Sequence, residues 1–84
     1  MTDKELTKKK IIYRSNHRGF KEMDMLLGKF VNKYIEKFDI NELNELNELL
    51  SIEDEILYKW YFENKSNKSI PKSNMSTMLK NFKL

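Results

Sequence analysis

The sequence predicts an all-α protein, a compact bundle of about five short helices in a single domain over residues 1–84. Apolar residues recur at spacings of three and four in several segments, which is the period of an amphipathic helix. No segment alternates apolar and polar residues with the period of two that a half-buried strand requires. Short breaks rich in Ser and Asn, which favour caps and turns, separate the periodic segments.

The first predicted helix runs from about Asp3 to Arg14 and ends in a break at residues 15–17. Leu6, Ile12 and Tyr13 are its candidates for burial. Because this apolar face is thin, we expect the helix to depend on packing against the rest of the domain.

The second helix is the most strongly patterned segment. Glu22 and Asp24 lie in its first turns, where the helix dipole favours negative charge. Gly28 lies in mid-helix, where glycine lowers helix stability by about 1 kcal/mol relative to Ala. Close packing of another helix at this position would explain why a glycine stands there. Its predicted apolar face consists of Phe20, Met23, Leu26, Leu27, Phe30, Val31, Tyr34, Ile35 and Phe38.

Two further helices follow in an acidic part of the chain. Asp39 with Glu42 three residues later predicts a capping box for a helix that carries a triple Asn-Glu-Leu repeat. Ser51 with Asp54 predicts the same arrangement for the fourth helix. The apolar face of the fourth helix is expected to comprise Ile52, Ile56, Leu57, Trp60 and Tyr61.

The C-terminal part is less strongly patterned. Residues 64–73, with the chain's only proline, Pro71, are predicted to be a linker. A weakly specified helix over residues 74–82 then places Met75, Met78, Leu79 and Phe82 on one face. The core is expected at about residues 4–63, with a mobile tail.

Composition excludes several functional classes. There is no cysteine, so disulfides and thiolate chemistry are absent, and one histidine does not make a metal site. No apolar run is long enough to span a bilayer, and we expect neither a secretory signal nor a transit peptide. The sequence therefore predicts a cytoplasmic monomer without membrane insertion, bound metal or catalytic residues.

Charge is distributed unevenly along the chain, although the net charge is only +3. Residues 1–22 carry +4, residues 36–63 carry −7 and residues 64–84 carry +5. Basic ends of this kind leave open a small helical protein that binds nucleic acid. The acidic middle and the scarcity of Arg argue against that alternative.

The block from Tyr13 to Phe30 contains both Arg residues and both Gly residues of the chain. Arg offers a planar fork of donors for bidentate recognition, and Gly lets another backbone approach closely. Arg18, Gly19 and Glu22 therefore suggest a contact surface. The alternative is an ordinary helix start with an internal Arg18–Glu22 pair at i, i+4.

The block resembles the small helical assembly factors that promote covalent flavin attachment to succinate dehydrogenase, a family marked by an Arg-Gly-x-x-Glu motif. The second signature of the family is similar to Asp54-x-x-Leu57-x-x-Trp60. The family often has a bulky residue where Asn16 stands and a Pro near Glu53. The resemblance in the first block covers Tyr13-Arg14-Ser15, His17-Arg18-Gly19, Glu22-Met23-Asp24, Leu26-Leu27-Gly28 and Phe30.

The resemblance implies a protein that binds the flavoprotein subunit of succinate dehydrogenase, or of the related fumarate reductase, and promotes its covalent FAD attachment. Flavinylation would be autocatalytic in the partner, so this chain would be no enzyme and would hold no FAD stably. A generic helical adaptor remains the other alternative. The predicted partner-binding residues are Arg14, His17, Arg18, Gly19, Glu22 and Asp24. Among them, Arg18 is expected to pair with a carboxylate or backbone carbonyls of the partner.

Overall fold

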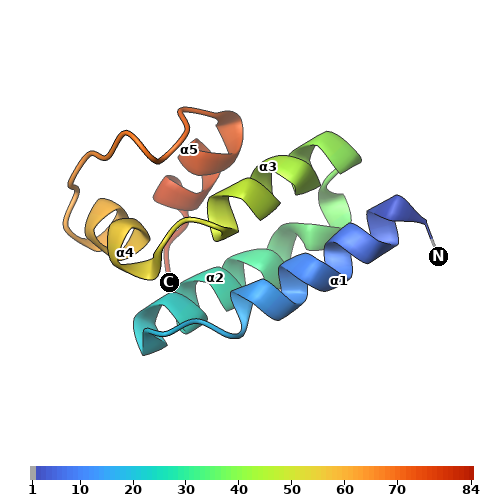
Figure 1. The fold of residues 1–84 in the computed structure, drawn as a ribbon, viewed down its shortest axis with the longest axis horizontal. Helices are drawn as coiled ribbons and strands as arrows, with labels where there is room; N and C mark the ends of the chain where they lie inside the picture. Colours follow the sequence, from blue (N-terminus) through green and yellow to red (C-terminus); the bar gives the residue numbers. More distant parts are fainter. Residues whose placement is uncertain (1) are drawn as a thin grey trace.

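Five α-helices and one short 3-10 helix form the fold of residues 2–84, the part of the chain that the computed structural model describes (Figure 1). No strand occurs in this part, so the all-α prediction is confirmed. Helix α1 packs against both α2 and α3, while α4 contacts α2 and α5 contacts α3. The elements are α1 (Asp3–Ser15), α2 (Lys21–Tyr34), η1 (Ile35–Lys37), α3 (Ile40–Leu50), α4 (Asp54–Phe62) and α5 (Asn74–Asn81).

The start of α3 follows the predicted capping box. The Asp39 carboxylate accepts from the Glu42 backbone N–H at 2.8 Å, and the Asp39 N–H donates to the Glu42 carboxylate at 3.0 Å. These reciprocal bonds satisfy two N–H groups that the first turn of a helix leaves without an intrahelical acceptor.

The predicted cap of α4 was wrong. Ser51 ends α3 instead, and its hydroxyl donates to the Glu48 carbonyl at 2.6 Å. Helix α4 begins at Asp54, with Glu53 as its N-cap and no side-chain cap. The physical reason is that the Asp54 carboxylate is bound to a distant segment of the chain and does not reach back to Ser51.

The inward face of α1 also differs from the prediction. Leu6, Ile12 and Tyr13 are 46%, 44% and 64% exposed, whereas Ile11 and Ser15 are fully buried. Because α1 packs between α2 and α3, only residues that share one narrow face of the helix point inward. Ile11 and Ser15 are four residues apart and share that face, while the next residues along the helix turn to solvent.

Helix α2 supplies the centre of the core, as predicted. Its buried residues are Met23, Leu26, Leu27, Phe30 and Val31, and Ile35 and Phe38 continue the same cluster. Two residues of the predicted face differ: Phe20 is 39% exposed, and Tyr34 is half-buried and packs against the cluster. A Cβ atom on Gly28 would lie 3.1 Å from the Asn16 side chain, so the end of α1 approaches this glycine closely.

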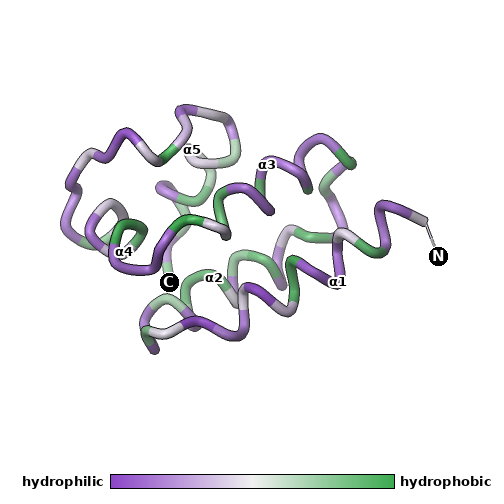
Figure 2. The backbone as a smooth tube through the Cα atoms, viewed as in Figure 1, coloured by the Kyte–Doolittle hydropathy of each residue, from purple (hydrophilic) through white to green (hydrophobic). Residues whose placement is uncertain are grey.

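The C-terminal segment belongs to the core, which extends beyond the predicted limit at residue 63. Ile70, Met75 and Leu79 are buried in the same cluster as the residues of α2 and α3. The ring of Phe82 packs edge-on against that of Phe30 at 5.4 Å. Hydrophobic stretches accordingly occur on all five helices, including α5 (Figure 2). A capping box of Ser73 and Ser76 fixes the start of α5.

Candidate functional site

The loop between α1 and α2 carries the Arg-Gly pair, and the first turns of α2 hold it in place. The backbone N–H of Arg18 donates to the Asp24 carboxylate at 2.7 Å. Asp24 is half-buried at this position. One of the predicted site residues therefore acts inside the chain, by tying the loop to α2.

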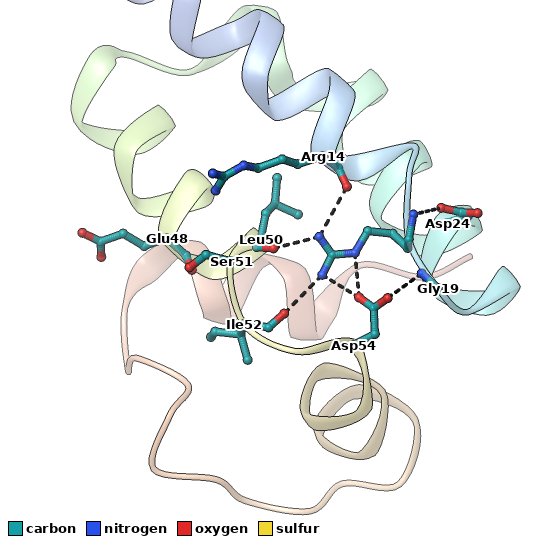
Figure 3. A network of polar contacts seen from close by, with 9 residues as sticks. Arg14, Gly19, Asp24, Glu48, Leu50, Ser51, Ile52 and Asp54 are labelled. Carbon is teal, nitrogen blue, oxygen red and sulfur yellow. Dashed lines mark hydrogen bonds and ion pairs between the residues drawn. The ribbon is translucent and has the colours of Figure 1, made fainter.

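The guanidinium of Arg18 is the centre of a polar network (Figure 3). Its Nε donates to Asp54 at 2.6 Å, and its Nη2 contacts Asp54 at 2.5 Å and the Ile52 carbonyl at 3.2 Å. Its Nη1 donates to the carbonyls of Leu50 at 2.7 Å and Arg14 at 3.3 Å. A guanidinium has five N–H donors, so each donor of Arg18 has an acceptor within its own chain.

This network joins segments that are far apart in the sequence. Side-chain exposure is only 9% for Arg18 and 17% for Asp54. The second carboxylate oxygen of Asp54 accepts from the Gly19 N–H at 2.7 Å (Figure 3). Asp54 therefore holds both residues of the Arg-Gly pair, and it fastens the α1–α2 loop to the start of α4.

The arrangement differs from two expectations. Arg18 was expected to offer its donors to a partner, but they are used within the chain. The alternative of an Arg18–Glu22 pair was wrong, since Arg18 pairs with Asp54 and Glu22 forms no ion pair among residues 2–84. Glu22 is instead exposed in the first turn of α2.

Four of the six predicted site residues have exposed positions: Arg14, His17, Gly19 and Glu22. The ring of His17 stacks on Tyr13, with centroids 4.0 Å apart and planes at 15°. Arg14 donates from Nη1 to the Asn47 side chain at 3.2 Å.

Gly19 is not required by the fold itself. Its φ angle is not positive, and an added Cβ would meet Asp54 at 3.5 Å, an ordinary contact. The absence of a side chain therefore leaves open surface above the loop without relieving any strain inside the domain.

An aromatic surface lies beside the loop. Phe20 was predicted to be in the core, but its ring packs edge-on against that of Tyr58 in α4, with the ring centroids 5.9 Å apart. The ring of Tyr58 in turn contacts that of Phe62, with the centroids 4.8 Å apart. Phe20 and Phe62 are 39% and 37% exposed. Aromatic side chains are enriched at protein–protein interfaces relative to the rest of the surface.

Sequence reasoning missed Asp54 as a site residue, because its partner lies 36 positions earlier. Its place in the second signature was the only signal available. Within residues 2–84, no group of three or more His, Cys, Asp or Glu side chains is placed to hold a metal ion. None of the helices in this range is long and apolar enough to cross a membrane.

Comparison with known proteins gives a consistent result. A family model described as flavinator of succinate dehydrogenase matches residues 9–83. The chain is 32% identical over 68 residues to a protein of Lodderomyces elongisporus, covering 81% of this chain and 42% of the relative. It is 38% identical over 72 residues to a protein of Kluyveromyces lactis, and this match covers 83% of this chain and 44% of the relative.

A third relative, from Arabidopsis thaliana, is 34% identical over 61 residues, covering 73% of this chain and 32% of the relative. All three carry the name succinate dehydrogenase assembly factor 2, mitochondrial. The chain thus spans less than half the length of these relatives. No solved structure shows significant similarity to it.

Proposed function

Because this chain belongs to the family of succinate dehydrogenase flavinators, we propose that it is an assembly factor that binds the flavoprotein subunit of succinate dehydrogenase. In this proposal it promotes covalent attachment of FAD to that subunit. The matched region, residues 9–83, includes the whole candidate site, and the relatives are named as assembly factors of the same enzyme. The family is not one of known catalytic enzymes.

The observation that carries the proposal is that the two charged residues of the Arg-Gly-x-x-Glu motif have different roles. Arg18 is saturated by acceptors of its own chain and fixes the loop, whereas Glu22 is exposed and without an ion pair among residues 2–84. A loop held this way loses little conformational entropy when a partner binds. Gly19 would then let the partner backbone approach closely, and Glu22 would accept its hydrogen bonds.

The exposed aromatic side chains extend this surface. Phe20 follows Gly19 directly, and Tyr58 connects it to Phe62 on α4. Burial of these rings against the flavoprotein would supply apolar contact area, while His17 and Arg14 would contribute polar contacts at the edge. The surface is suited to holding a partner in one conformation.

The chemistry is assigned to the partner. In our proposal flavinylation proceeds autocatalytically within the flavoprotein, FAD becomes attached there, and this chain binds no FAD stably. The half-buried ion pair of Arg18 and Asp54 supports this view, because its charges are used to hold the loop. The proposal further includes the fumarate reductase flavoprotein as a second partner, a monomeric state and a cytoplasmic location.

Covalent flavin on the flavoprotein subunit, read as fluorescence on a denaturing gel, tests the proposal. We expect the signal to be lost in cells without the gene. Glu22→Gln removes one charge from an exposed position, so the fold should persist while partner affinity falls about tenfold, the loss typical of a charge-assisted hydrogen bond. The signal should fall accordingly at limiting expression.

Glu45→Gln is the matched control, since Glu45 is also exposed but lies on α3 outside the candidate site. It should support flavinylation like the unmodified protein. Equal flavin signal with and without the gene would contradict the assembly role and favour a generic adaptor. A Glu22→Gln variant that binds and acts normally would remove Glu22 from the proposed contact surface.

A further inference from the structure

An open pocket of about 410 Å³ lies between α4, the segment 64–73 and α5. In Figure 1 this segment forms the long arch that leads from α4 to α5. None of the six predicted site residues lines the pocket, so its chemistry is separate from that of the Arg-Gly loop. The lining residues that matter here are Trp60, Asn67, Ile70, Lys72, Thr77 and Lys80.

Lys80 places a positive charge in the wall of this pocket. Its ammonium donates to the carbonyls of Trp60 and Tyr61, which lie at the end of α4, and sits 5.1 Å from the centroid of the Trp60 ring. An ammonium has three donors, so one remains for a ligand. Burial, together with the nearby charge of Lys83, lowers the pKa of Lys80 from its ordinary value.

Among residues 2–84, no carboxylate forms an ion pair with Lys80. The ion pairs among residues 2–84 involve Lys8, Arg18, Lys59 and Lys65, and neither Lys72 nor Lys80 takes part in one. Residues 64–84 hold five Lys and no acidic residue. A concave surface lined by charges of one sign raises the local concentration of ions of the opposite sign.

The remaining walls combine apolar and hydrogen-bonding groups. The half-buried Trp60 and the buried Ile70 supply apolar surface, and the side-chain amide of Asn67 supplies neutral donors. The Thr77 hydroxyl donates to the Ser73 carbonyl, so it offers the pocket an acceptor. Pockets that bind small molecules pair apolar walls with a few polar groups in this way.

We propose that this pocket binds a small organic anion that carries a planar ring. Lys72 and Lys80 hold the anionic group, and the ring packs against Trp60. The site is independent of the proposed role in flavinylation, so neither proposal depends on the other.

Trp60 is the only tryptophan of the chain and lines this pocket, so a ligand that packs against its ring should change the tryptophan fluorescence. We would titrate the full chain with AMP, which joins a planar ring to a phosphate, and compare adenosine and inorganic phosphate. Excitation at the red edge of tryptophan absorption avoids absorption by the ligand. A saturable change is expected with AMP, and a much weaker one with either part alone. No saturable change at millimolar AMP, or equal binding of adenosine, would overturn the proposal.

Lys72→Gln tests the role of charge without disturbing the fold, because Lys72 is exposed and forms no ion pair among residues 2–84. It should weaken AMP binding about tenfold, the effect of one charge-assisted contact. Lys9→Gln on α1, also exposed, is the matched control and should leave binding unchanged. Equal affinity in the two variants would contradict the assignment. Much tighter binding of single-stranded DNA than of AMP would instead indicate a nucleic-acid surface and overturn the small-anion proposal.

Discussion

Replacement of Arg18 with Ala is expected to lower the free energy of unfolding by about 3–5 kcal/mol, the usual cost of removing one partner of a buried ion pair. The change leaves the Asp54 carboxylate without its cation in a site where it is only 17% exposed. It also leaves the carbonyls of Leu50 and Ile52 without the donors they have now. A domain of this size has a total stability of roughly 3–5 kcal/mol, so the variant should be largely unfolded.

Urea denaturation followed by helical circular dichroism measures this loss as a shift of the transition midpoint. Arg14→Ala is the matched control: the same side chain is removed from an exposed position on α1. We expect it to change stability by no more than about 0.5 kcal/mol. If Arg18→Ala unfolded at the same urea concentration as Arg14→Ala, the buried network would not hold the loop as we describe.

This expectation affects how the motif is tested in cells. A loss of flavinylation with Arg18→Ala would not distinguish a lost partner contact from a lost fold. Glu22 and Gly19 are better positions, because Glu22 is exposed and a side chain on Gly19 would meet only an ordinary contact inside the domain. A defect at either position with unchanged stability would report on the contact surface itself.

The second large effect is expected in the last helix. Leu79→Ala should cost about 2–5 kcal/mol, because Leu79 is fully buried and its removal leaves a cavity. The loss would be comparable to the whole stability of the domain. It follows from the position of α5 against α3 and from the inclusion of Leu79 in the same apolar cluster as the residues of α2.

Leu84→Ala is the control for this change, since Leu84 is 53% exposed and loses the same atoms. Thermal or urea unfolding of the two variants would be compared directly. A small effect of Leu79→Ala, similar to that of Leu84→Ala, would mean that α5 contributes little to the core, in line with the core limit at about residue 63 that the sequence predicts.

Much of the local structure follows from the sequence because its causes lie within a few residues. The apolar period of α2 defines one inward face whichever helix covers it. The Asp39–Glu42 capping box needs only residues three apart, and it forms as predicted. In α1 the apolar residues do not define one face, so the sequence does not show which side of the helix is buried. Contact of α1 with both α2 and α3 decides which side that is.

The sequence by itself determined the helical class, the positions of most helices and the motif that resembles the flavinator family. The tertiary structure alone decided what each residue of that motif does. The sequence alone does not distinguish the two charged residues of the motif, but in the fold Arg18 is half-buried and paired with Asp54, whereas Glu22 is exposed. The reason is physical: a buried guanidinium requires acceptors that come from segments 32 to 36 residues away, and only the packing of α1, α3 and α4 brings those acceptors together.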